Sequence, residues 1–128
     1  MQTKTLEKLL IEANDLVERL SFEESINLIK NSKVVIIDVR EESEVYNLGL
    51  VKNAIHIPRG LLEFKLSPNS PNNPVLIDDE TNILVYCAGG YRSALAAKTL
   101  LDLGFKNVYN LGGFQDWIQS GGEIQPNV

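Results

Sequence analysis

The stretch 82-NILVYCAGGYRSALAAKTLLDL-103 decides the fold. Its residues 83–86 form a short apolar and β-prone run, which predicts a strand that stops at Cys87. Two successive glycines follow, and they allow a sharp turn with positive φ. From Arg92 onward the sequence is rich in Ala and Leu and predicts a helix, for which Gly104 supplies the usual C-terminal residue. The stretch therefore predicts a strand, a tight loop and a helix.

The position of Cys87 points to a chemical role. Several backbone N–H groups converge between a strand end and a helix N-terminus, and the helix macrodipole favours an anion there. Arg92 adds a permanent positive charge. Helix N-termini with cationic neighbours lower the pKa of cysteine from about 8.5 to roughly 3.5–7.5. Cys87 is therefore a candidate nucleophile that we expect not to be buried; the alternative is a buried structural cysteine.

Length and charge limit the possible classes of protein. A chain of 128 residues is enough for one domain with its own core. The formal net charge of −5 argues against general binding to nucleic acid or to an anionic membrane. An anionic substrate would therefore have to be attracted by a local group of donors.

The cysteine and histidine counts limit the chemistry further. One cysteine excludes an intramolecular disulfide and a CxxC redox pair. One cysteine and one histidine cannot build a usual zinc site, so we expect no metal. We expect no other cofactor. The sequence has no apolar run long enough to span a membrane, and acidic residues interrupt its N-terminal region. These features predict a cytoplasmic protein.

The N-terminal region has a helical pattern of its own. Leucine, alanine and valine recur at helical spacing over residues 3–20, which predicts an amphipathic helix. We expect this helix to pack on its own domain; the alternative is a partner subunit. Ser21 and Glu24 have the spacing of a capping box, so a second helix should begin at Phe22. We therefore divide the chain into an N-terminal helical extension, 1–20, and a domain, 21–128.

Strands and helices alternate along that domain. We expect strands at 33–38, 54–56, 83–86 and 107–111, helices at 22–29, 41–48, 92–103 and 114–120, and a helical turn at 61–64. The unbroken apolar run at 33–38 is typical of a parallel strand buried on both faces. The alternation predicts an α/β fold with a small central parallel sheet and helices on both faces.

Three other segments carry weaker signals. Residues 67–81 contain three prolines among Asn and Ser, which predicts a long irregular loop of the kind that often forms a lid or binding element. Gly112 and Gly113 predict a turn. Trp117 is expected to pack in the core together with its neighbours Phe114 and Ile118. The tail through Pro126 is expected to be frayed.

Three motifs resemble those of single-domain rhodaneses, a family of sulfurtransferases. CAGGYRS at 87–93 fits the CxxGxRS active loop, IIDVREESEV at 36–45 with GLVKNAIHIP at 49–58 fits the first signature, and LGGFQDWIQSGGEI at 111–124 fits the closing signature. The resemblance covers about residues 22–124. The leading helix and PRGLLEF at 58–64 are similar to a subgroup of small bacterial rhodaneses with an N-terminal helical extension.

The sequence departs from the family pattern at two places. Leu50 stands where the family usually has histidine, so any role of that histidine is absent here. Asn72 and Asn73 fill a loop position that is often aromatic and contains histidine in the subgroup. This second departure bears on lid contacts and donor preference.

The resemblance implies a double displacement on a rhodanese-like fold. Cys87 would take a sulfane sulfur from a small anionic donor such as thiosulfate and pass it, as a persulfide, to cyanide, a thiol or a sulfur-accepting protein. The residues implied to surround that sulfur are Ala88, Gly89, Gly90, Tyr91, Arg92 and Ser93, and Arg92 would also anchor the loop.

Residues at the same edge of the sheet are expected to support this site. Ligands bind at the carboxyl ends of parallel strands, where Asp38 and Cys87 lie and which Arg59 follows. Arg59 is a candidate for holding an anionic donor; the alternative is a solvated surface arginine. Asp38 and Arg40 are expected to support the site through a structural ion pair or through hydrogen bonds that brace the loop; the alternative is a direct role in the site. His56 is expected to be a satisfied structural group.

Two other functions stay open. Cysteine phosphatases and arsenate reductases use a Cys-x5-Arg loop around a tetrahedral oxyanion, whereas only four residues separate Cys87 from Arg92. The shorter loop makes a smaller cradle, which favours a single sulfur atom. Rhodanese-like domains also act as binding modules without turnover. The presence of both Cys87 and Arg92 argues against that role but leaves open a persulfide carrier for a partner protein.

Overall fold

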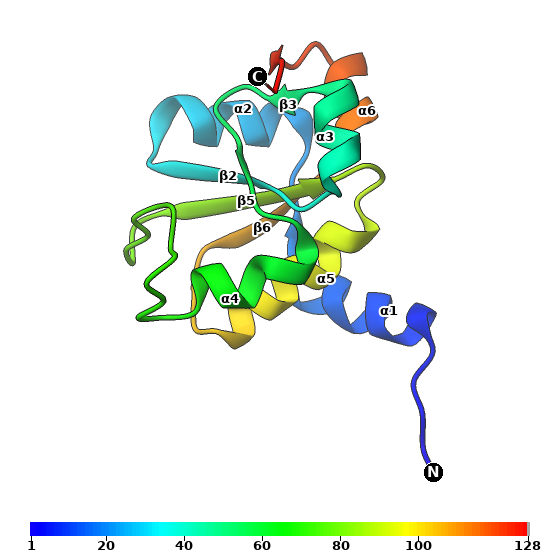
Figure 1. Cartoon of the computed structure of the whole chain (residues 1–128). Coiled ribbons are helices and arrows are strands. Elements are labelled where there is room, and N and C mark those ends of the chain that lie inside the picture. Colours follow the sequence, from blue (N-terminus) through cyan, green and yellow to red (C-terminus); the bar gives the residue numbers. More distant parts are fainter. Residues whose placement is uncertain (128) are drawn as a thin grey trace.

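Five parallel strands form the central sheet of the computed structural model, which describes residues 1–127 (Figure 1). Their order is β1 (Glu18–Arg19), β6 (Val108–Gly113), β5 (Asn82–Cys87), β2 (Val34–Asp38) and β4 (Ile55–His56). A separate antiparallel pair joins β3 (Leu50–Val51) to β7 (Ile124–Gln125). The strand that carries the cysteine, β5, is therefore the middle strand of the sheet.

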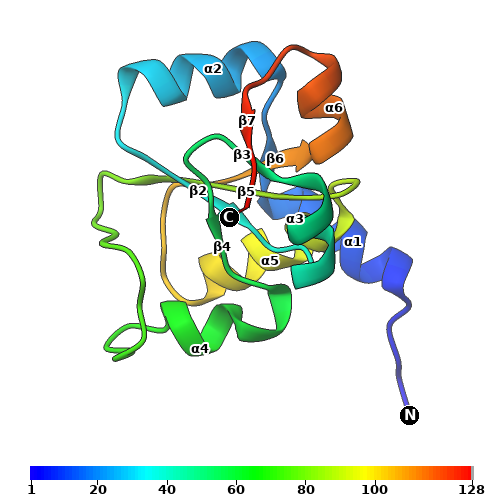
Figure 2. The same ribbon diagram turned by 45° about the horizontal axis from the view of Figure 1, so that its top comes forward.

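Helices cover both faces of the sheet, as Figures 1 and 2 show. One face carries α1 (Leu6–Leu16), the 3-10 turn η1 (Arg59–Leu61) with α4 (Leu62–Leu66), and α5 (Tyr91–Asp102). The other carries α2 (Phe22–Asn31), α3 (Glu42–Leu48) and α6 (Phe114–Gln119). Each face has its own hydrophobic cluster, with Leu62 and Leu100 in the first and Val45 and Trp117 in the second. The predicted α/β fold is confirmed.

The buried strands follow from the sequence pattern. β2 pairs with β5 in register from Val34 opposite Asn82 to Asp38 opposite Tyr86, so the apolar run of β2 lies between two parallel neighbours. On β5, Ile83 and Val85 face one cluster while Leu84 faces the other. Both faces of the sheet are covered, which explains the unbroken apolar character of these strands.

The second helix begins as its capping box predicts. The Glu24 N–H donates to Ser21 Oγ at 3.1 Å, and the Ser21 N–H donates to Glu24 Oε1 at 2.8 Å. The last strands and helices also lie close to the expected ranges, and Gly104 has a positive φ of 103° just after α5. Strong local signals therefore set most element boundaries.

The first helix is shorter than predicted. It ends at Leu16, and residues 18–19 leave the helix to form β1 at the edge of the sheet. Glu18 and Arg19 pair with Tyr109 and Asn110 of β6. In the sheet their backbone groups make hydrogen bonds that replace those of a longer helix. The helix packs on α5 of its own chain, as expected, through the buried Ala13. Its Leu6, Leu9 and Leu16 are exposed.

The prediction of a frayed C-terminal tail is wrong. Residues 124–125 form β7, which pairs with β3 so that Leu50 lies opposite Gln125. The Lys52 N–H and the Trp117 indole both donate to the Glu123 carbonyl, at 3.0 and 2.9 Å. Trp117 is buried in the core as expected, whereas Ile118 is exposed. These hydrogen bonds hold the tail against the α3 and α6 side of the molecule.

The long loop 67–81 is irregular, as predicted, but it does not cover the Cys87 loop as a lid would. Asp78 pairs with Lys33, just before β2, and Asn107 Nδ2 donates to the Asp79 carbonyl just before β6. These contacts place the loop at the amino ends of the strands, opposite the edge where Cys87 lies (Figure 1). Along residues 1–127 no helix combines the length and the apolar character that crossing a membrane requires.

Candidate active site

The Cys87 loop connects the middle strand of the sheet to the helix that follows. β5 ends at Cys87 and α5 begins at Tyr91, with only residues 88–90 between them. Gly90 serves as N-cap with a left-handed φ of 95°, a conformation that favours glycine. The second glycine of the motif therefore allows the chain to turn directly from strand into helix, with the N-terminus of α5 beside the sulfur.

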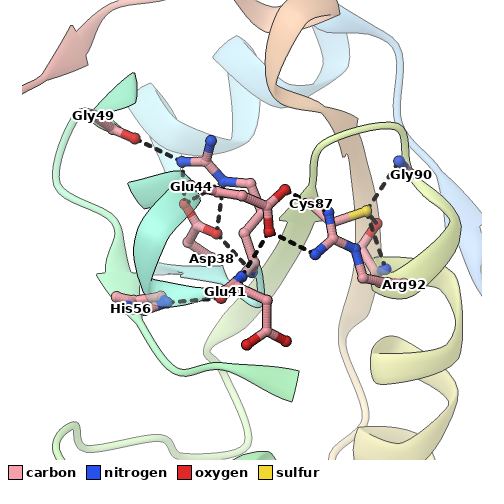
Figure 3. A network of polar contacts seen from close by, with 10 residues as sticks. Asp38, Glu41, Glu44, Gly49, His56, Cys87, Gly90 and Arg92 are labelled. Carbon is pink, nitrogen blue, oxygen red and sulfur yellow. Dashed lines mark hydrogen bonds and ion pairs between the residues drawn. The ribbon is translucent and has the colours of Figure 1, made fainter. Parts of the chain in front are cut away.

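Hydrogen bonds from this loop converge on the Cys87 sulfur (Figure 3). The Gly90 N–H donates to Sγ at 3.0 Å and the Ser93 N–H donates to it at 3.4 Å. The Ser93 hydroxyl oxygen also lies 3.4 Å from Sγ. The prediction of an unburied cysteine is wrong, because only 1% of Cys87 is exposed. The loop folds back over the sulfur and β6 pairs alongside it, so the thiol lies at the bottom of the cradle.

Two opposing effects act on the ionisation of this thiol. Burial raises the pKa of Cys87, but hydrogen bonds from the Ser93 hydroxyl and from the N–H groups of Ser93, Gly90 and Gly89 lower it more, so the net pKa lies below the ordinary value. A buried cysteine without such donors would have a raised pKa. The arrangement therefore favours a thiolate despite the burial of the sulfur.

Arg92 links the loop to α3 through a bidentate ion pair (Figure 3). Its Nη1 and Nη2 donate to Glu44 Oε2 and Oε1 at 2.7 and 2.9 Å. Glu44 also accepts from the Glu41 N–H at 2.8 Å and so caps α3. The Arg92 guanidinium lowers the pKa of the Glu44 carboxyl to about 2. Much of the charge of Arg92 is therefore balanced, and its main geometric effect is to tie the loop to α3.

A second, fully buried ion pair lies beneath α3. Arg40 Nη2 donates to Asp38 Oδ2 at 2.7 Å and to the Gly49 carbonyl at 2.6 Å. His56 Nε2 lies 2.8 Å from the Arg40 carbonyl, so the only histidine is a satisfied structural group as expected. The Arg40 guanidinium packs 4.1 Å from the centre of the Phe114 ring. This cluster fixes the two ends of α3, and with them the carboxylate that holds Arg92.

Asn110 on β6 is a further part of the loop's surroundings that the sequence did not reveal. Its Oδ1 accepts from the Ser93 hydroxyl at 2.8 Å, and its Nδ2 donates to the Gly90 carbonyl at 3.0 Å. Asn110 and Glu44 both contact the loop from other elements. The capping-box spacing between Glu41 and Glu44 was a readable signal for α3, but no local pattern pairs either residue with the loop.

The two closing glycines extend β6 and do not form the predicted turn. A Cβ on Gly113 would lie 2.6 Å from the Ala88 carbonyl oxygen, so glycine is needed for the loop to approach the strand. Gly112 has a φ of 105°, and a Cβ there would lie 2.3 Å from Nη2 of Arg19. The Arg19 guanidinium, supplied by β1, therefore lies on β6 beside the active loop.

Of the predicted site residues, Arg59 lies away from the Cys87 loop and Tyr91 points out from it into solvent. Arg59 donates to Glu63 Oε1 at 2.9 Å and to Thr99 Oγ1 at 3.0 Å. Thr99 lies eight residues past Tyr91, which is about 12 Å along α5. The structure thus does not bring the Arg59 guanidinium to the Cys87 loop. Tyr91 projects from the loop with 69% of its surface exposed.

In this α/β fold the middle strand ends in a cysteine, and backbone N–H groups point at its sulfur. These features define a class of α/β proteins in which such a loop can stabilise an anion at the cysteine. The chain belongs to the rhodanese-like domain family, whose model matches residues 21–120. β1, and with it Arg19, lies just outside that match.

Relatives of the chain include a named sulfurtransferase and a protein of unknown function. The thiosulfate sulfurtransferase GlpE of Coxiella burnetii is 35% identical over 101 residues, which cover 78% of this chain and 86% of that protein. A solved structure from Rhodopseudomonas palustris, described as a protein of unknown function and possible tyrosine phosphatase, is 39% identical with a TM-score of 0.86, and the match covers 98% of this chain and 97% of that one.

A named sulfurtransferase is also similar in structure. The thiosulfate sulfurtransferase of Pseudomonas aeruginosa is 25% identical with a TM-score of 0.76, and the match covers 96% of this chain and 23% of that one. The family and fold of the chain are therefore shown, while its relatives carry descriptions of more than one activity.

Proposed function

We propose that the protein is a sulfurtransferase that carries a sulfane sulfur as a persulfide on Cys87. The observation that carries this proposal is the convergence of the Gly90 N–H, the Ser93 N–H and the Ser93 hydroxyl on one buried sulfur. These donors favour the thiolate, which is the nucleophilic form of cysteine. A general base is then unnecessary.

The proposed reaction has two displacement steps. The Cys87 thiolate attacks the outer sulfur of thiosulfate, a new S–S bond forms, and the old S–S bond breaks as sulfite leaves with the electron pair. Cyanide or a thiolate then attacks the outer sulfur of the persulfide and restores the Cys87 thiolate. The N–H groups of residues 88–93 would stabilise the persulfide anion, as they stabilise the thiolate. No cofactor takes part in either step.

Other residues are assigned supporting roles. Arg92 would anchor the loop through Glu44, and the Asp38–Arg40 pair would brace α3 behind that contact. The net charge of −5 does not favour nucleic acid or an anionic membrane as a partner, and a small anionic donor would be recognised locally against this charge. The proposed acceptor is cyanide, a thiol or a sulfur-accepting protein, and the proposed setting is the cytoplasm.

The competing reaction is phosphoryl or arsenate chemistry on the same thiolate. The four-residue spacing between Cys87 and Arg92 favours a single sulfur over a tetrahedral oxyanion. In addition, the guanidinium of Arg92 already binds Glu44 in a bidentate manner and would have to leave it to clamp an oxyanion.

Turnover assays separate these possibilities. We expect the protein to form thiocyanate from thiosulfate and cyanide and to leave an aryl phosphate intact, and we expect Cys87→Ser to lose the first activity while keeping its fold. Hydrolysis of the phosphate without thiocyanate formation would replace the proposal with a phosphatase. Transfer only from another persulfide donor would point to a dedicated carrier.

A further inference from the structure

The Asn110 side chain is a buried polar group with a fixed orientation. It is 3% exposed and makes three hydrogen bonds. Its Oδ1 accepts from the Gly112 N–H at 2.9 Å and from the Ser93 hydroxyl at 2.8 Å, while its Nδ2 donates to the Gly90 carbonyl at 3.0 Å. Only oxygen can accept from an N–H and only nitrogen can donate to a carbonyl, so these two backbone groups determine which way the amide faces.

The Ser93 hydroxyl lies between two acceptors but has a single proton. Asn110 Oδ1 is 2.8 Å away on one side, and Cys87 Sγ is 3.4 Å away on the other. While Cys87 is a thiol, its S–H can donate to Ser93 Oγ and the hydroxyl proton can bond to Asn110. A thiolate has no proton to donate and instead accepts a hydrogen bond, which the Ser93 hydroxyl can supply. Asn110 Oδ1 then still accepts a hydrogen bond from the Gly112 N–H.

We infer that Asn110 is a positioning residue that holds Ser93 so that its hydroxyl proton turns from the Asn110 oxygen to the Cys87 sulfur when the thiol ionises. The same amide holds the Gly90 carbonyl, and Gly90 supplies the shortest hydrogen bond to that sulfur. Asn110 thus controls two of the donors to Cys87 without contacting it. This inference deepens the proposed function, on which it rests for its effect on sulfur transfer.

Four charged side chains surround the loop, and none of them is altered in the test. Arg92 on α5 pairs with Glu44 on α3, while Arg19 on β1 lies against Gly112 and faces Asp116 on α6 at 4.0 Å. A change in Cys87 ionisation after substitution of Asn110 would therefore come from the hydrogen-bond network.

The test is a mutant cycle read through the ionisation of Cys87. The ultraviolet absorbance of the thiolate is titrated against pH in Asn110→Ala, Ser93→Ala and the double variant, with Cys87→Ser subtracted as background. The chain has one cysteine, so the signal reports on this thiol alone. Asn107→Ala, just before the same strand, is the matched control, and Asn110→Ser replaces Asn110→Ala if the latter does not fold.

We expect Asn110→Ala to move the Cys87 midpoint downward by about one pH unit, which is about tenfold more thiolate below the midpoint, because the bond from the Ser93 hydroxyl to Asn110 exists only while Cys87 is a thiol. The double variant should move little further than Ser93→Ala, because Asn110 acts mainly through that hydroxyl. An unmoved midpoint in Asn110→Ala, or shifts that add fully in the double variant, would overturn the inference. The titration needs no sulfur donor, so it gives an answer even if the protein transfers no sulfur.

Discussion

Three groups of its own loop lie within hydrogen-bond distance of the Cys87 sulfur, while burial works against its ionisation. Because the hydrogen bonds lower the pKa of Cys87 more than burial raises it, ionisation of the thiol depends more on the conformation of the loop than on solvent access. That conformation is held from outside by Glu44, through Arg92, and by Asn110. The reactivity of one residue is thus set by contacts from α3 and β6.

A pH-dependent contribution to stability is expected from Glu44. Its pKa falls from 4.5 to about 2 in the folded protein, first because of Arg92, so the pair stabilises the fold above pH 4.5 and this contribution is lost as pH falls through about 2. We expect Glu44→Gln to lower the free energy of unfolding at neutral pH by about 1 kcal/mol or less, because solvent screens the half-exposed pair. Denaturant unfolding measures this effect.

The control for that measurement is Glu42→Gln, an exposed residue on the same helix. The difference between wild type and Glu44→Gln should shrink as pH falls from 4.5 towards 2, while Glu42→Gln stays close to wild type. An equal loss of stability at low and neutral pH in Glu44→Gln would contradict the ion-pair explanation.

Single residues were predictable where chemistry is local. The Cys87 cradle could be predicted because a strand end, two glycines and a helix start lie within seven residues. Glu44 and Asn110 contact the loop across 48 and 17 positions, and only the folded sheet brings them there. The place of Arg59 after a strand did not reveal that its side chain contacts Glu63 and Thr99.

The approach of β6 to the Cys87 loop depends on Gly113. Gly113 has an ordinary φ of −105°, so alanine would not strain its backbone, but the added Cβ would lie 2.6 Å from the Ala88 carbonyl oxygen. The loop must shift to relieve that contact. We therefore expect Gly113→Ala to lower the rate of sulfur transfer at least about tenfold, since small displacements of reacting groups cost large factors.

Gly60→Ala is the matched control, because no atom lies within 4 Å of its added Cβ. It should transfer sulfur at the wild-type rate. Equal rates for Gly113→Ala and Gly60→Ala would mean that contact between β6 and the loop does not position the sulfur.

Element prediction succeeded where the pattern was long enough to read. β2, β5, α2 and α5 carry apolar runs, capping signals or helical spacing, and their predicted bounds were close to those observed. β1, β3 and β7 have two residues each and were not predicted, whereas β4 is equally short but lies in the apolar stretch that ends at Pro58. The pairing of β1, β3 and β7 depends on partners that are distant in the sequence. The sequence therefore did not predict that the first helix ends at Leu16 or that the C-terminal tail forms a strand.

Two contacts join the N-terminal segment, residues 1–20, to the rest of the molecule. β1 extends the sheet at β6, and α1 packs on α5 through the fully buried Ala13. We expect Ala13→Asp to lower the free energy of unfolding by about 3 kcal/mol, because it buries a charge without a partner. Ile11→Asp on the exposed side of the same helix should have a much smaller effect in the same denaturant titration. Equal effects would mean that α1 does not pack on α5 in solution.

Intact-protein mass spectrometry after incubation with thiosulfate detects the proposed persulfide on Cys87 without a coupled assay. We predict a gain of one sulfur atom on the wild type that disappears on addition of cyanide, and no gain on Cys87→Ser. A wild-type protein that gains no sulfur from thiosulfate or from a persulfide donor would rule out the proposed persulfide carrier. A gain that persists in Cys87→Ser would contradict it equally.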